Sequence, residues 1–181
     1  MTDQTRIKKL SSVPSVERIN ALTTGDLNDL CDATDAAIEA GGGFGWLELP
    51  SRDILERYWR GVVTVPTRWL FVARLDGVVC GTAQITLPSP NNEAQKHAVQ
   101  LSTHFIVPWA RGQGLSRMLL EKVEKDVSDE GFKVINLDVR ETQDTAIKLY
   151  ESHGFEECGR HPYIADVKGQ AVPGRYYAKI L

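Results

Sequence analysis

The sequence is poor in the residues that mark several large classes of protein. Among its 181 residues there are three cysteines, Cys31, Cys80 and Cys158, which are odd in number and far apart. Such a pattern forms neither a disulfide framework nor a paired-cysteine metal site. The four histidines are also too scattered for a metal-ligand motif, so we expect no metal centre.

Long apolar runs and a strong charge imbalance are missing as well. The stretch MTDQTRIKKL at the start has no apolar signal core, and no run of about 20 apolar residues could span a bilayer. The formal net charge of -3 argues against nucleic acid or an anionic membrane as the main partner. We therefore expect a cytoplasmic protein with no nucleic-acid partner and no membrane partner, formed by one domain over residues 1–181.

Turn signals and apolar periodicity predict an α/β (α+β) domain with one central, mixed but mostly antiparallel sheet. The strongest local signal is Asp76-Gly77, which lies between two β-rich runs and predicts a hairpin. This antiparallel pair excludes a simple doubly wound parallel sheet. We expect about seven strands and about four helices. The strands are expected at 6–10, on both sides of 76–77, and over 97–107, 133–139, 155–160 and 174–181; the helices over 26–40, 51–60, 114–130 and 143–153.

The stretch VPWARGQGLSRMLL, residues 107–120, places two glycines where a strand becomes a helix. Glycine inside a regular element costs about 0.5–1 kcal/mol relative to alanine, so a turn or a ligand must require it. The first-turn N–H groups of a helix have no intrahelical partners, and Gly112 and Gly114 would let a phosphate approach them beside Arg111. No GK[ST] or GxGxxG follows, which excludes a P-loop and a dinucleotide fingerprint. The alternative is a plain turn with Gly112 at positive φ.

Two stretches resemble signatures of the GCN5-related N-acetyltransferase (GNAT) superfamily. RGQGLS at 111–116 is similar to the acetyl-CoA signature R/Q-x-x-G-x-G/A, with Ser116 where Gly or Ala is usual. TAIKLYESHGF at 145–155 is similar to the second signature, in which a helix ends in a tyrosine and Gly-Phe follows. The usual asparagine before that tyrosine is Gln143 here. GFGWLELP and GRHPYIADVKGQ also resemble a bacterial branch that includes tabtoxin-resistance acetyltransferases.

This resemblance implies a GNAT-like fold, acetyl-CoA as co-substrate and a binding site for acetyl-CoA formed by identifiable residues. The pantetheine arm would lie beside the strand that ends at 105–108, and the pyrophosphate would rest on the turn at 112–116. Tyr150 would act on the departing thiolate; the alternative is an aromatic ring packed on the helix face. The implied cofactor-binding residues are Phe105, Ile106, Val107, Arg111, Gly112, Gln113, Gly114, Leu115, Ser116, Gln143 and Tyr150.

A general base is harder to assign from the resemblance. Relatives in the narrower branch carry a glutamate where this chain has Gln100, which cannot take a proton. Glu48 is one replacement, and His97 and His104 are others, because histidine titrates near neutrality; a water chain to solvent is a further alternative. Strand alternation predicts Gln100 and His104 on one face and His97 and Thr103 on the other. The candidate catalytic residues are thus Tyr150, Gln100 and Glu48.

The favoured interpretation is direct transfer of acetyl from acetyl-CoA to a primary amine of a small molecule, either an amino acid or an amine-bearing toxin or antibiotic. Peptide or protein N-terminal acetylation is an alternative that would need an open groove. A third alternative is a non-catalytic acyl-CoA-binding module, because Gln100 cannot act as a base. In this family, Trp46 and Tyr58 would lie near the acceptor site, whereas Trp59 suits a core position of its helix. Dimers are common in the family, so a homodimer is possible.

Overall fold

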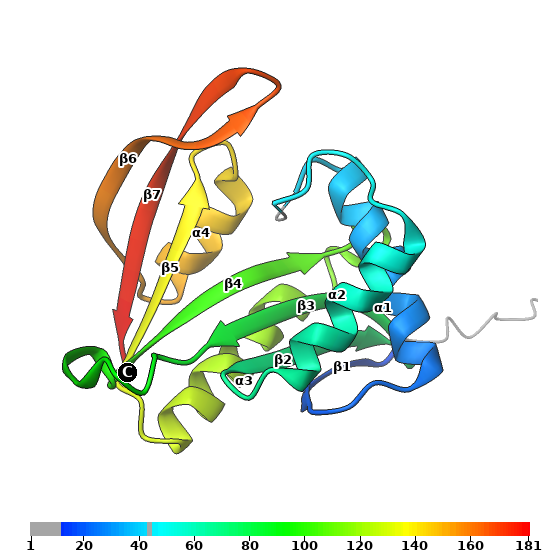
Figure 1. The fold of residues 1–181 in the computed structure, drawn as a ribbon, viewed down its shortest axis with the longest axis horizontal. Coiled ribbons are helices and arrows are strands. Elements are labelled where there is room, and N and C mark those ends of the chain that lie inside the picture. Colours follow the sequence, from blue (N-terminus) through cyan, green and yellow to red (C-terminus); the bar gives the residue numbers. More distant parts are fainter. Residues whose placement is uncertain (1–11, 43–44) are drawn as a thin grey trace, which may run out of the picture.

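The computed structural model describes residues 12–42 and 45–181, in which seven strands form one sheet in the order β1-β2-β3-β4-β5-β7-β6 (Figure 1). Neighbouring strands are antiparallel except β4 and β5, which are parallel. The strands are β1 Pro14–Ile19, β2 Arg68–Leu75, β3 Val78–Thr86, β4 Ala98–Ile106, β5 Val134–Arg140, β6 Glu156–Val167 and β7 Gln170–Ile180, and the α-helices are α1 Thr24–Glu39, α2 Arg52–Thr64, α3 Leu115–Asp129 and α4 Asp144–Ser152.

Most elements lie where the sequence predicts them. The hairpin is confirmed: Leu75 pairs with Val78, and Asp76 and Gly77 both have positive φ, as a two-residue β-turn of this kind requires. The second helix runs one turn further than expected, and the last two strands are longer than expected. The expected strand at 6–10 lies outside the described residues. The first described strand, Pro14–Ile19, was missed because its Pro, Glu and Arg weaken the β signal and only pairing with β2 defines it.

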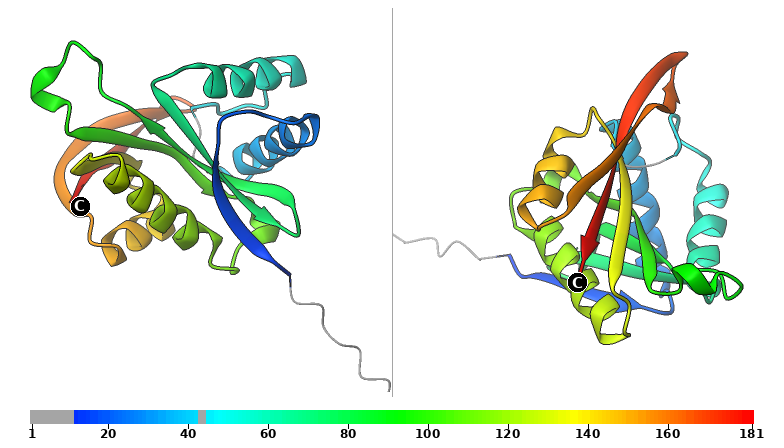
Figure 2. Two further views of the ribbon diagram at one scale, coloured as in Figure 1. Left: turned by 90° about the horizontal axis from the view of Figure 1, so that it is seen from below. Right: turned by 90° about the vertical axis from the view of Figure 1, so that its left-hand side faces the viewer.

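The helices cover the two faces of the sheet in separate pairs. Helices α1 and α2 lie on one face and α3 and α4 on the other, as the left view of Figure 2 shows. Helix α1 begins with a capping box between Thr23 and Asp26, which satisfies two backbone donors. Helix α3 packs on the sheet through a stripe at every fourth residue. That stripe is fully buried and consists of Leu115, Leu119, Val123 and Val127.

The parallel strands β4 and β5 separate along their length. They pair only where Ala98–Gln100 lies against Val134–Asn136, and beyond this point they diverge toward their C-terminal ends (Figure 1). A sheet that opens in this way exposes backbone at its centre. The separation therefore creates room for a ligand between two strands that would otherwise be bonded to each other.

Strand β4 carries a β-bulge at the same point. Thr103 has a φ of 51°, and the pairing with β3 shifts between Gln84, which faces Ser102, and Thr82, which faces Phe105. One extra residue reverses the alternation of all that follow it. His104 therefore contacts α3 and α4, whereas Gln100 stays on the opposite face. The predicted common face for Gln100 and His104 is wrong for this reason.

Candidate active site

One cavity, of about 400 Å³, lies between the end of β4, the glycine turn and the facing side of α4. It gathers most of the residues predicted to bind the cofactor, although they come from three separate segments. Those that line it are Phe105, Ile106, Arg111, Gly112, Gly114, Leu115, Ser116 and Gln143.

The glycine turn presents unoccupied backbone donors to this cavity. Gly112 and Gly114 have φ values of 79° and 76°, and a Cβ added to either would meet no protein atom within 4 Å. Left-handed backbone therefore requires glycine here, and the space above it is open. Gly114 is the N-cap of α3 and offers no side chain to cap it. Within residues 45–181, the N–H groups of the first three residues of α3 donate to no backbone carbonyl. The first that does is Met118 N–H, which lies 3.0 Å from Gly114 O.

Three of the predicted cofactor residues have other contacts or lie outside the cavity. The guanidinium of Arg111 donates through Nε to Ile106 O at 3.1 Å and so ties the end of β4 to the turn. Val107 is fully buried, its N–H donates to Cys80 O and its carbonyl accepts from Ala110 N, so it does not line the cavity. Gln113 is exposed between the two glycines and does not line it either.

A second cavity, of about 510 Å³, lies in the opening between β4 and β5. Its walls come from these two strands, from β6, from α4 and from the loop that contains Gly45 and Leu47. Three residues, His104, Gln143 and Ala146, line both this cavity and the first. The two cavities therefore meet at these three residues.

Tyr150 lies on the wall of the second cavity, and its ring is buried. Its hydroxyl is 3.2 Å from Nδ1 of His104. Burial raises the pKa of Tyr150 well above its usual value, and the nearby carboxylate of Asp138 adds to the increase. The phenol thus keeps its proton at every working pH and can donate it in a hydrogen bond.

The structure also brings a carboxylate to Gln100 that sequence reasoning missed. The amide Nε2 of Gln100 donates to Oδ1 of Asp138 at 3.3 Å, across the paired start of β4 and β5. Asp138 lines the second cavity and is exposed between the buried Leu137 and Val139. Alternation along 133–139 is the one sequence signal that could have placed Asp138 away from the core, but only the parallel pairing of β4 with β5 puts it beside Gln100.

The other candidates lie further from the two cavities. Glu48 is exposed next to Leu47 but does not line the second cavity, and His97 is exposed just before β4. Trp59 is fully buried, and its Nε1 donates to Thr34 Oγ1 at 3.0 Å, which confirms the core position expected of it. Tyr58 accepts a hydrogen bond from the buried Gln84.

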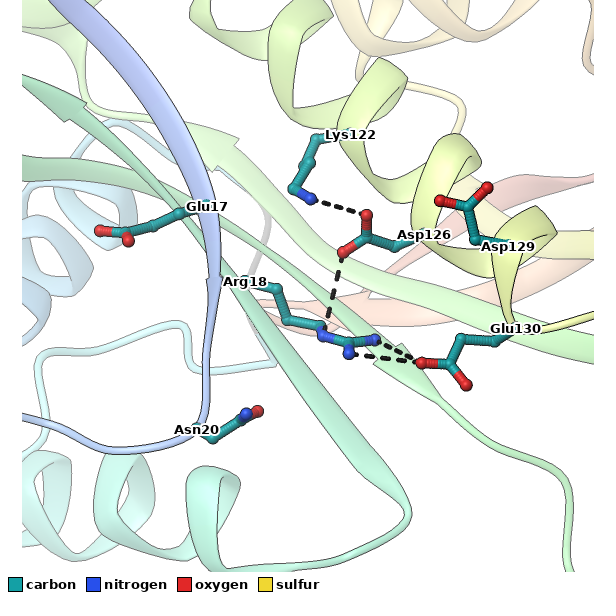
Figure 3. Close-up of a pocket in the computed structure, with 7 residues that line it drawn as sticks. All are labelled: Glu17, Arg18, Asn20, Lys122, Asp126, Asp129 and Glu130. Carbon is teal, nitrogen blue, oxygen red and sulfur yellow. Dashed lines mark hydrogen bonds and ion pairs between the residues drawn. The ribbon is translucent and has the colours of Figure 1, made fainter.

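A further hollow, of about 470 Å³, lies between β1 and α3 (Figure 3). Four of its charged groups pair with each other: Lys122 bonds Asp126 at 2.7 Å, and Arg18 lies 3.8 Å from Asp126 and 3.4 Å from Glu130. The other two, Glu17 and Asp129, pair with Arg74 and Lys125 outside the hollow. None of the signature residues lies there. We interpret this hollow as a solvated surface whose charged groups are held in ion pairs.

Comparison with known proteins agrees with this geometry. The model of the acetyltransferase (GNAT) family matches residues 32–155. Over 129 residues the chain is 60% identical to an uncharacterized N-acetyltransferase from the hisH-hisA intergenic region of Azospirillum brasilense, an alignment that covers 71% of this chain and 77% of that protein.

Solved structures show the same fold. A ribosomal-protein-alanine N-acetyltransferase from Brucella melitensis has a TM-score of 0.77 at 23% identity, over 92% of this chain and 99% of that one. The yncA protein of Salmonella typhimurium, solved with its cofactor acetyl-CoA, has a TM-score of 0.76 at 17% identity, over 94% and 95% of the two chains. At these identities the likeness shows the fold, as predicted. Because the family match spans more than half of its length, the chain belongs to the acetyltransferase (GNAT) family and is an acetyl-CoA-dependent N-acetyltransferase.

Proposed function

We propose that the enzyme acetylates the primary amine of a small molecule, such as an amino acid or an amine-bearing toxin or antibiotic. The observation that carries this proposal is the meeting of two cavities at His104, Gln143 and Ala146. One cavity ends in a turn suited to a pyrophosphate, and the other contains a carboxylate and a buried phenol. A space of about 510 Å³, walled by five segments, suits a compact acceptor.

In this proposal the first cavity holds acetyl-CoA. The pyrophosphate lies against the N–H groups at the head of α3, where the helix dipole contributes roughly half a positive charge. The pantetheine arm follows β4 past Phe105 and Ile106, where the strands have separated. The thioester then reaches the junction of the cavities, beside Tyr150. Gln143 borders this junction while its amide donates to Gly41 O at 3.3 Å, so its contact with the cofactor is secondary to its structural bond.

The second cavity would hold the amine. The carboxylate of Asp138 attracts a protonated amine, which loses one proton to solvent and so regains its lone pair. When the neutral nitrogen bonds to the carbonyl carbon it becomes a strongly acidic ammonium, and Asp138 accepts a proton from it. The C–S bond then breaks, and the hydroxyl of Tyr150 donates to the developing thiolate. Gln100 acts here by donating to Asp138 and so orienting it. The carboxylate missing from position 100 is thus supplied by the neighbouring strand.

A peptide N-terminus is the second candidate acceptor. The exposed apolar side chains of Leu47, Leu49 and Tyr163 lie on or next to segments that line the second cavity, and a peptide would cover them. A non-catalytic acyl-CoA-binding module is less well supported, because Asp138 and Tyr150 both face the place where an amine would lie.

One screen separates these functions. Release of the CoA thiol from acetyl-CoA is measured with pooled amino acids, polyamines and amine antibiotics, and in parallel with peptides of varied N-terminal residue. We expect release with the small-molecule pool. Release with peptides alone would favour the second candidate, and binding of acetyl-CoA without release in either pool would show that neither class of acceptor is the substrate. The tabtoxin-resistance-like branch, the homodimer and the cytoplasmic location stay predictions.

A further inference from the structure

His104 occupies a position that the chemistry above leaves unexplained. It is one of the three residues that line both cavities, and the bulge at Thr103 turns it toward α3 and α4. Its ring contacts Tyr150 on one side and Ser116 on the other. A half-buried polar ring at the junction of two cavities requires a reason.

The partners of the ring define which nitrogen carries the proton. Nε2 is 3.2 Å from the carbonyl oxygen of Ser116, which can only accept, and 3.1 Å from the hydroxyl oxygen of the same residue. The proton of a neutral ring therefore lies on Nε2. In the free enzyme Nδ1 is then an acceptor, and the hydroxyl of Tyr150, at 3.2 Å, is its donor. The phenol has a single proton, which turns from Nδ1 to the sulfur as the thiolate develops.

The surroundings keep the ring neutral. Burial lowers the pKa of His104 to about 4, and the nearby His153 of α4 acts in the same direction against the opposing effect of the Ser116 carbonyl. The groups that face the ring are thus Ser116 from α3, Tyr150 from α4, and His153 at the end of α4. A neutral ring can bond to the phenol without withdrawing or supplying a full charge.

We infer that His104 is a positioning residue: its imidazole holds the phenol oxygen of Tyr150 at the junction of the cavities and ties it to the first turn of α3. The inference rests on the proposed role of Tyr150. It also accounts for Ser116, the serine that stands where the signature usually has Gly or Ala, because the Ser116 hydroxyl adds a second contact to Nε2. The turn that holds the pyrophosphate and the phenol that meets the sulfur are thereby joined through one side chain.

The first test uses three variants and CoA thiol release from acetyl-CoA with the small-molecule pool. His104→Leu removes both hydrogen bonds, and His104→Asn restores an acceptor near the position of Nδ1. We expect His104→Leu to lower kcat by about 10- to 100-fold, because a misplacement of about 1 Å costs roughly 10²-fold. The KM for acetyl-CoA should change little. His104→Asn should recover most of the loss, and His97→Asn, at an exposed histidine outside both cavities, should leave kcat unchanged.

A double-mutant cycle shows whether His104 acts through Tyr150. In the Tyr150→Phe background, where the hydroxyl is absent, His104→Leu should have no further effect on kcat. Equal effects in both backgrounds would show a general structural role and overturn the inference. Full turnover by Tyr150→Phe, or no turnover with the pool, would overturn the proposed function, and the inference would fall with it.

Nitrogen NMR of the free enzyme provides a readout independent of activity. We expect the His104 ring to carry its proton on Nε2 and to show no titration between pH 5 and 8. A ring that titrates in this range, or that carries its proton on Nδ1, would contradict the geometry even if Tyr150→Phe is inactive. Failure of the inference and failure of the proposed function can therefore be distinguished.

Discussion

Replacement of Gly114 by valine tests the use of the glycine turn most directly. A Cβ at this position meets no protein atom within 4 Å, so the left-handed backbone, and not crowding of the Cβ, strains the folded state. That strain is worth about 1–2 kcal/mol, or roughly 2–8 °C of melting temperature for a domain of this size. The valine also blocks the approach of a phosphate to the first-turn N–H groups, so affinity for acetyl-CoA should fall far more than stability does.

Thermal melting with and without acetyl-CoA measures both effects. Acetyl-CoA at about 100 times its Kd should stabilise the wild type by about 2.7 kcal/mol. The shift should be absent from Gly114→Val. Gly77→Val is the matched control, because Gly77 has a similar φ of 87° and equally open surroundings in the distant β2–β3 hairpin. The control should lose a similar amount of stability and keep the full shift. A normal acetyl-CoA shift in Gly114→Val would refute the phosphate-binding role of the turn.

Three further substitutions test the rest of the site. Tyr150→Phe should lower turnover by about 10²–10⁴ without weakening acetyl-CoA binding, and an unchanged kcat with chemistry rate-limiting would make the ring a packing residue. Gln100→Glu places a second carboxylate beside Asp138, and like-charge repulsion raises the pKa of one of the two. The pH–rate profile should therefore gain an acidic limb, and Asp138→Asn should shift that limb. A profile that neither substitution changes would argue against this pair. Gly81→Ala would put a Cβ 2.5 Å from Phe105 O. We expect the free energy of unfolding, measured with urea, to fall by about 1–3 kcal/mol and acetyl-CoA binding to weaken. Unchanged stability would show that β4 can shift freely.

Local interactions determined much of this protein from its sequence alone. Asp76-Gly77 specifies its hairpin because the backbone of two adjacent residues sets the turn. The apolar residues at every fourth position define the buried side of α3, and Gly112 and Gly114 mark the turn before it. Both signatures also lie within single segments. These features depend on residues close together in the chain, so they can be predicted before the fold is known.

The proposed catalytic arrangement depends on contacts between distant segments, and only the tertiary structure decided it. Thr103 is an ordinary strand residue in sequence, yet its positive φ reverses the faces of β4 and turns His104 toward Tyr150. Asp138 reaches Gln100 because β4 and β5 are parallel neighbours, a pairing between residues 38 positions apart. The position of a bulge and the register of two strands depend on the packing of the whole sheet. The conformational preference of a single residue is small compared with the energy of pairing its strand with a neighbour.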